Sequence, residues 1–402
     1  MYDEKSNFAK DSFYNKNKKN KLKKRLKNIN LPEKIKVNYN IIIIIILIII
    51  IIIQFLIILF SKKNKPNNDN NNNNINIIKN TNKTLGSLYL YKIDESLFIN
   101  NNQSNALIKK NIIHIAMSLD NLGIYRTLVS MTSALENQDK KNTILIYYLL
   151  LSSDFDTKNI QIFESLKQNY TVAINYYIIP NIFGFLEKWK NTYTVYYKLL
   201  LPIMFPEIER IIFLDGDTLI FKDLSEMYDL PFDNNYVLGY PFHTPYIIDH
   251  LGIKPINYIK GGVLLFNIHE IRKKNMDLEL LLYTMKNMSN LIFHEQDTLN
   301  YVYNGKIGLL PFKFGIYLYG NFKEVKDNYL YKLRIKVNYD EVERALEDPT
   351  IVHLCCCNPK IWHKNTKHER GFNHTCYKYQ KIFYSYANKT KYYDEIYKKY
   401  MK

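Results

Sequence analysis

Hydrophobic positions along the C-terminal three quarters of the chain follow two different periods. Short continuous apolar runs predict strands, and apolar residues three or four positions apart predict helices. In chain order the predicted elements are strand 112–117, helix 125–136, strand 142–151, helix 156–169, strand 171–179, helix 192–204 and strand 210–214. Such alternation is typical of an α/β fold with a largely parallel sheet, which binds its ligands beyond the carboxyl ends of the strands.

The longest apolar run of the chain lies near the N-terminus and predicts a membrane span. Residues 41–60 carry no charge, and Gln54 is their only polar side chain. About 20 residues, each rising about 1.5 Å, cross a bilayer core of about 30 Å. The run is longer than the apolar part of a cleavable signal and no small-residue cleavage site follows it, so we expect an uncleaved anchor.

Charge on the two sides of this run predicts its orientation. Residues 1–40 form a basic tail with twelve Lys or Arg and four Asp or Glu, whereas residues 61–80 hold only four lysines. The positive-inside rule therefore places the tail in the cytosol and the rest of the chain in the lumen of the Golgi or the endoplasmic reticulum. Residues 61–105 are rich in asparagine and too polar to bury a core, so they predict a stem before one folded domain over 106–402.

The formal net charge of +17 would by itself suggest an anionic partner such as nucleic acid. The tail accounts for 12 − 4 = +8 of this charge, and the remaining +9 is spread over the rest of the chain. The folded part is only mildly basic for its size, so we expect no nucleic-acid partner.

The C-terminal region holds all the cysteines, namely Cys355, Cys356, Cys357 and Cys376. None forms a C-x-x-C pair, which argues against a zinc ribbon or a thioredoxin-type motif. In an oxidising lumen one or two of them could form disulfides, but the pairing cannot be read from one sequence. After Trp362 the chain is rich in lysine and tyrosine and predicts a solvated helix that caps the domain.

Two carboxylates follow the predicted strand 210–214. Asp215 and Asp217 flank Gly216, and a second apolar run begins directly afterwards. Paired carboxylates at the mouth of a buried strand suit a hard divalent cation that also holds a diphosphate. Taken alone, however, the same residues also fit an ordinary Asp-Gly turn between two strands.

The sequence around this pair resembles glycosyltransferase family 8. The matching blocks, in the order of the family, are YYKLLLP at 196–202, RIIFLDGDTLIFKDL at 210–224, YIKGGVLLFN at 258–267, HEQDTLN at 294–300, GKIGLLP at 305–311 and IVHL at 351–354. The family includes bacterial lipopolysaccharide galactosyl- and glucosyltransferases and glycogenin-type enzymes. The resemblance implies the GT-A fold, a Rossmann-like mixed α/β sheet that binds a nucleotide-sugar, and a glycosyltransferase that retains the configuration of the sugar.

The resemblance also implies which residues bind the cofactor and the donor. Asp215, Asp217 and His353 would hold Mn²⁺ or another divalent cation, which suits two carboxylates and one imidazole. The implied donor-binding residues are Asp120, Asn121, Lys198, Asp215, Gly216, Lys260, Gly261, Gly262 and Lys360.

Glu295, Gln296 and Asp297 are the implied catalytic residues, beside the anomeric carbon and the acceptor. We expect metal-dependent transfer of a hexose or pentose from a UDP-sugar to a hydroxyl of a glycan, glycoprotein or glycolipid. Double displacement and attack on the face of the leaving group both remain open.

Three departures from the family pattern keep a second hypothesis open. Leu122 stands where a base-stacking tyrosine is common, Lys260 replaces an asparagine that contacts the sugar, and the segment from Lys360 to Trp362 is one residue further from His353 than expected. The alternative is a catalytically inactive homologue that still binds a nucleotide-sugar or a glycan. A metal-dependent phosphodiesterase would explain the Asp pair but not the blocks at 258–267 and 294–300.

Overall fold

The structure is a computed structural model that describes residues 111–189, 191–205, 207–241, 251, 258–317, 339–356, 360–364 and 374–401. The predicted tail, membrane span and stem over 1–105 lie outside the described residues. None of the described helices combines the length and the apolar character that crossing a bilayer requires.

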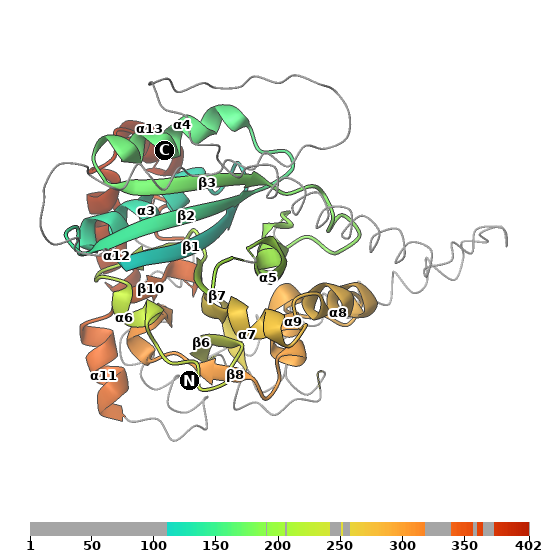
Figure 1. The fold of residues 1–402 in the computed structure, drawn as a ribbon. Helices are drawn as coiled ribbons and strands as arrows, with labels where there is room; N and C mark the ends of the chain where they lie inside the picture. Colours follow the sequence, from blue (N-terminus) through green and yellow to red (C-terminus); the bar gives the residue numbers. More distant parts are fainter. Residues whose placement is uncertain are drawn as a thin grey trace, which may run out of the picture. The chain divides into compact units, whose positions relative to one another are not determined.

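A seven-stranded mixed sheet forms the centre of the folded domain (Figure 1). Its order is β3-β2-β1-β4-β7-β6-β8. The strands are β1 (Asn111–Leu119), β2 (Thr143–Leu151), β3 (Val172–Ile178), β4 (Arg210–Leu214), β6 (Val237–Pro241), β7 (Ile259–Asn267) and β8 (Ile307–Leu309). The first four run parallel, as the alternation of elements predicts, whereas β7 is antiparallel to both β4 and β6. The strand pattern therefore predicted the first half of the sheet correctly, and the second half is mixed, as in the GT-A fold.

A second, three-stranded sheet packs beside the first and has the order β5-β10-β9. It consists of β5 (Thr218–Ile220), β10 (Ile351–His353) and β9 (Ile316–Tyr317). Strand β10 is antiparallel to β5 and parallel to β9. Because β5 begins one residue after Asp217, this sheet joins the end of β4 to a strand more than 130 positions later in the chain.

The helix predicted over 125–136 is confirmed as α3 (Ile124–Asn137), but two other predicted helices are irregular. Residues 157–168 form η2 (Thr157–Asn159), α4 (Ile160–Glu164) and η3 (Ser165–Gln168). The helix predicted over 192–204 is η4 (Thr194–Leu200) followed by α5 (Leu201–Met204). Pro202 has no amide proton to donate to the preceding turn, so it begins a new helix instead of continuing the old one.

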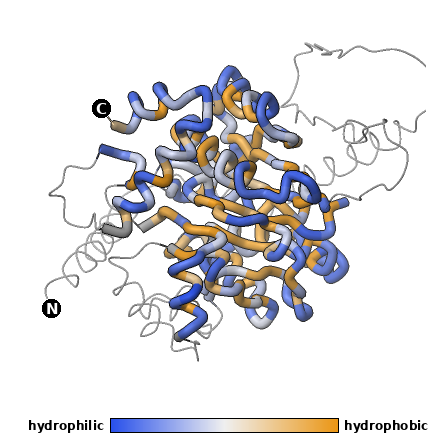
Figure 2. Tube along the Cα trace, turned by 90° about the vertical axis from the view of Figure 1, so that its left-hand side faces the viewer, coloured by the Kyte–Doolittle hydropathy of each residue, from blue (hydrophilic) through white to orange (hydrophobic). Residues whose placement is uncertain are grey.

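The remaining helices surround the two sheets (Figure 1). They are α6 (Ser225–Tyr228), α7 (Ile268–Lys273), α8 (Glu279–Asn287), α9 (His294–Val302), η7 (Phe312–Phe314), α11 (Tyr339–Glu347) and η8 (Leu354–Cys356). Apolar residues concentrate on the strands inside the domain, and polar residues lie on the outer helices and turns (Figure 2).

The C-terminal end is not the solvated helix that its composition predicts. It forms two helices, α12 (His374–Ala387) and α13 (Tyr393–Met401), and α12 packs against α3. Phe383, Ile396 and Tyr400 are buried in the main hydrophobic core. Tyrosine was misjudged as a surface residue because its ring can be buried while its hydroxyl reaches a polar partner.

Candidate functional site

Two antiparallel pairings bring the three predicted metal ligands together. The β4–β7 pairing places Leu214 opposite Val263. It continues one residue past the end of β4, where the amide of Asp215 donates to the carbonyl of Gly262 at 2.8 Å. The β5–β10 pairing places Thr218 opposite His353. The register of these strands therefore places Asp215, Asp217 and His353 close together at the carboxyl end of β4.

The geometry of this cluster fits a divalent cation. His353 Nε2 lies 3.0 Å from Asp217 Oδ1 and 3.5 Å from Asp215 Oδ2. One ligand atom from each of the three residues lies within 4.8 Å of the others. Two hard carboxylate oxygens and one imidazole nitrogen are a donor set that suits Mn²⁺. The described residues therefore fit the metal that the sequence predicts.

The close approach of His353 requires glycine at position 262. A Cβ atom built on Gly262 would lie 2.1 Å from Cε1 of His353 and 2.8 Å from Oδ2 of Asp215. Similarly, a Cβ atom on Gly216 would lie 2.3 Å from Oγ1 of Thr127. Both glycines thus allow side chains of other elements to pack directly against the backbone. Glycine is needed at these positions because it has no Cβ atom to collide with those side chains.

Without a metal, His353 and Asp217 form a buried ion pair. Burial disfavours the charged imidazole, but Cys355 and Asp217 outweigh burial and raise the pKa of His353 to about 10. Burial also opposes ionisation of Asp217, but His353 and Lys360 hold the pKa of Asp217 well below its usual range. In the metal-free protein the imidazole is thus protonated at neutral pH and cannot act as a ligand.

We expect Mn²⁺ binding to release about one proton and to strengthen about tenfold for each unit that the pH rises between about 6.5 and 8.5. A metal binds only neutral imidazole, so it must displace the proton that the raised pKa of His353 retains. Titration calorimetry in two buffers of different ionisation enthalpy would measure this proton release. His353→Ala is the control and should release none; an affinity of the unmodified protein that does not change with pH would contradict the expectation.

A buried ion pair lies directly beside the metal ligands. Lys198 on η4 is 1% exposed, and its Nζ donates to Glu295 Oε1 at 3.0 Å and to the carbonyl of Gly261 at 2.8 Å. Nζ also lies 3.8 Å from Asp215 Oδ1. Burial disfavours the ammonium, but the carboxylates of Glu295 and Asp215 outweigh it and raise the pKa of Lys198. Burial raises the pKa of Glu295, and Lys198 opposes that rise.

The other two residues predicted as catalytic bind protein groups. Gln296 accepts a hydrogen bond from the amide of Gly261 at 3.1 Å and donates to the hydroxyl of Tyr258 at 3.2 Å. Asp297 is fully buried and accepts from the Tyr258 hydroxyl at 2.6 Å and from the amides of Ile292 and Phe293. Both side chains therefore hold the start of β7 against α9.

Comparison with known proteins identifies the family. The sequence pattern of "Glycosyl transferase family 8" matches residues 114–366, which include every ligand of the cluster. The chain belongs to glycosyltransferase family 8. Similarity to General stress protein A of Bacillus subtilis (strain 168) amounts to 24% identity over 276 residues, which is 65% of this chain and 91% of that protein.

Solved structures agree with the GT-A fold of the family. The galactosyltransferase LgtC, solved in complex with donor and acceptor sugar analogs, superposes with a TM-score of 0.57 at 14% identity and covers 69% of this chain and 96% of its own. The bifunctional glycosyltransferase WbbM superposes with a TM-score of 0.56 at 20% identity, over 75% of this chain. The chain spans only 53% of WbbM. At these identities the similarity shows the fold alone.

The loop after β1, where the family resemblance predicts nucleotide binding, is held by its own side chains. Asp120 Oδ1 accepts from the amides of Leu122 and Gly123, both at 3.0 Å. Asn121 donates to the carbonyl of Asp154 at 2.9 Å and accepts from the amide of Asp156 at 2.9 Å. These bonds leave Leu122 at the tip, where its side chain is 65% exposed.

Two lysines reach the cluster from β7 and from the segment after β10. Lys260 Nζ donates to the Sγ of Cys355 at 2.8 Å. Lys360 Nζ lies 3.3 Å from Asp217 Oδ2 and donates to the carbonyl of Cys355 at 2.7 Å. Cys355 forms no disulfide, whereas Cys376 is disulfide-bonded. The one-residue shift of Lys360 along the sequence therefore does not keep its ammonium away from Asp217.

Sequence reasoning missed two cations near the cluster. Arg126 in the first turn of α3 lies 6.0 Å from the ring centre of Trp362, and Lys399 in the last turn of α13 lies 5.1 Å from the ring centre of Tyr125, the residue before Arg126. The sequence could have pointed to Arg126, because a cation in the first turn of a predicted helix is disfavoured by the helix dipole and therefore calls for an explanation. Lys399 had no such signal, because its place depends on how α13 packs.

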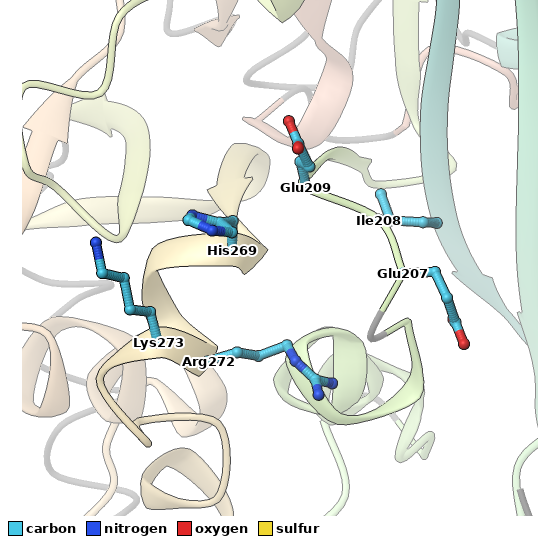
Figure 3. A pocket seen from close by; sticks show the side chains of 6 residues that line it. All are labelled: Glu207, Ile208, Glu209, His269, Arg272 and Lys273. Atoms are coloured by element: carbon cyan, nitrogen blue, oxygen red, sulfur yellow. The ribbon is translucent and has the colours of Figure 1, made fainter. Parts of the chain in front are cut away.

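A hollow lies at the amino end of β4, the end away from the metal cluster. It has a volume of about 460 Å³ and is lined by Glu207, Ile208, Glu209, His269, Arg272 and Lys273. Glu207 and Glu209 lie on one side of it and the basic residues on the other, and the side chains point apart instead of converging on one position (Figure 3). The hollow therefore shows no arrangement that selects a ligand.

Proposed function

We propose that this family 8 enzyme transfers a hexose or a pentose from a UDP-sugar to a hydroxyl of a glycan, glycoprotein or glycolipid, with retention of configuration. The observation that supports the proposal best is the convergence of Asp215, Asp217 and His353 at one point, with Lys360 beside them. Such a cluster at the carboxyl end of a strand suits a metal-bound diphosphate better than it suits a turn.

The three ligands would hold Mn²⁺ or another divalent cation. A bound cation of this kind supplies Lewis acidity that stabilises negative charge on the departing nucleoside diphosphate. Lys360 adds a positive charge at the same position, since its ammonium lies 3.3 Å from Asp217. Positioning and electrostatic stabilisation supply most of the free energy of catalysis in such a site.

Residues of α9 and β7 would form the sugar side of the site. Glu295 and Lys198 neutralise each other at 3.0 Å, and Gly261 lies against both. In this arrangement Gln296 and Asp297 act as positioning residues, because their polar atoms hold Tyr258 and Gly261. Glu295 is the remaining side-chain carboxylate of the predicted catalytic set, and both retaining mechanisms stay open for it.

We infer that the enzyme acts in the lumen of the Golgi or the endoplasmic reticulum. The hypothesis rests on the sequence alone: the apolar run 41–60 would anchor the chain, residues 1–40 would stay in the cytosol, and residues 61–105 would form the stem of the catalytic domain 106–402. Protease treatment of sealed microsomes tests it. Digestion of the catalytic domain without detergent would contradict the orientation.

A donor screen tests the proposed activity. Each common UDP- or GDP-sugar is incubated with the purified protein, with and without Mn²⁺, and the released nucleotide is measured. Release of UDP from one donor, dependent on metal and absent in the Asp215→Asn/Asp217→Asn variant, would support the proposal and identify the sugar. Metal-dependent UDP binding without release from any donor, in the presence of acceptors, would favour the inactive homologue instead.

A further inference from the structure

The positive charge of Arg126 is disfavoured by the dipole of the helix on which it lies. It occupies the first turn of α3, where the helix dipole disfavours positive charge. Within the described part of the chain its guanidinium forms neither a hydrogen bond nor an ion pair, and its Cζ lies 6.0 Å from the ring centre of Trp362. A cation–π contact at this distance offsets only part of the cost of a cation at this position.

Two more cations lie over aromatic rings near Arg126, one over Trp362 and one over Tyr125. Lys360 Nζ lies 5.4 Å from the ring centre of Trp362. Lys399 Nζ lies 5.1 Å from the ring centre of Tyr125, the neighbour of Arg126, and forms no ion pair among the described residues. Three segments far apart in the sequence thus each hold a positive charge against the ring of Trp362 or of Tyr125.

The packing of α13 holds Lys399 in this position. The amide of Lys364 donates to the carbonyl of Tyr400 at 2.9 Å, and the rings of Trp362 and Tyr400 lie 6.3 Å apart. Tyr400 is 7% exposed and belongs to the main core. Lys399, the preceding residue, projects from this fixed backbone, and its ammonium is partly covered by the rings of Tyr125 and Tyr400, 5.1 and 5.7 Å from their centres, although the residue as a whole is exposed.

The charges of this cluster act on one another, and they lie near the metal ligands. Partial burial, and after it the charge of Arg126, lower the pKa of Lys399, while Asp120 opposes them. Thr127, the residue after Arg126, lies against the backbone between the two metal-binding aspartates, since a Cβ atom built on Gly216 would lie 2.3 Å from Thr127 Oγ1. Like charges on neighbouring segments repel one another, and an anion bound between them would remove that cost.

We propose that Arg126 and Lys399 bind the phosphates of the nucleoside diphosphate donor, so that α13 completes the donor site. This inference rests on the proposed function. A guanidinium is well suited to two phosphate oxygens at once, and a lysine adds a point charge. Helix α13 lies beyond residues 114–366, so this part of the donor site belongs to the chain itself and not to the matched family pattern.

Calorimetric titration of the full-length protein in detergent tests the inference. UDP and uridine are titrated in turn in saturating Mn²⁺, using the unmodified protein, Arg126→Gln, Lys399→Gln and the double variant. We expect each single variant to bind UDP about tenfold more weakly and the double variant about 100-fold more weakly. Uridine should bind all four proteins equally, because it has no phosphate.

Lys398→Gln is the matched control, since Lys398 is the exposed neighbour of Lys399 on α13 and should not affect UDP binding. Unchanged melting temperatures would show that the variants are folded. If the unmodified protein binds UDP with metal and the double variant binds it equally well, the inference is overturned and the proposed function stands. Failure of the unmodified protein to bind any nucleoside diphosphate would overturn the proposed function itself. If only transfer to a phosphate-bearing acceptor is lost, the cluster recognises the acceptor and the inference is also overturned.

Discussion

Replacing Asp217 with asparagine is expected to weaken Mn²⁺ binding and metal-dependent donor turnover by at least about 100-fold. The amide of asparagine has the shape of the carboxylate but not its charge, so it is a much poorer ligand for a hard cation. The substitution also removes the negative charge that lies 3.0 Å from His353 and 3.3 Å from Lys360. Metal affinity measured by calorimetry and UDP release measured with the donor found in the screen would report both effects.

Asp233→Asn provides the matched control for this prediction. Asp233 is exposed, lies in the turn before β6 and has a φ of 47°, a conformation that asparagine adopts readily. It should therefore leave metal binding and turnover unchanged. If Asp217→Asn retained metal affinity within a few-fold of the unmodified protein, the assignment of the cluster as a metal site would be wrong.

Replacing Lys198 with methionine is expected to lower the free energy of unfolding by about 3–5 kcal/mol. Methionine fills a similar volume, but it leaves the buried carboxylate of Glu295 without the ammonium that now lies 3.0 Å away. The pKa of Glu295, which burial already raises, should rise further. Urea unfolding at neutral pH would measure the loss.

A double variant separates the ion pair from packing. Lys198→Met combined with Glu295→Gln removes both charges, so most of the lost stability should return. Lys222→Met is the control at the surface, because Lys222 pairs with Asp348 where both side chains are largely exposed, and it should cost less than about 1 kcal/mol. Equal losses of unfolding free energy in Lys198→Met and Lys222→Met would show that the buried ion pair contributes no more to stability than the surface pair.

The periodicity of apolar residues predicted the first four strands well, but only one of the three predicted helices is a regular helix. The strands over 142–151 and 171–179 lie within one residue of β2 and β3, because fully buried strands form continuous apolar runs. The helix predicted over 156–169 is broken, since Ser165 donates its hydroxyl to the carbonyl of Ile162 at 2.6 Å. Such bonds to the backbone compete with a regular helix and do not appear in a hydrophobic pattern.

The chemistry of the site was partly predictable in the same way. Asp215 and Asp217 follow an apolar strand directly, so their place at the end of β4 could be read from the sequence. The role of His353 could not, because position 353 reaches Asp217 only through the β5–β10 pairing. Family resemblance supplied that residue, and the register of two strands explains why it fits.

The sequence by itself determined the local features of this protein: the first four strands of the α/β domain, the carboxylate pair after β4 and the apolar run that predicts an anchor. Only the tertiary structure decided that Lys198 pairs with Glu295, 97 positions away, and that Lys399 lies over the ring of Tyr125. Hydrophobic period and turn chemistry depend on residues within a few positions of one another. The distance between side chains on different elements depends instead on strand register and helix packing, which the whole core sets together.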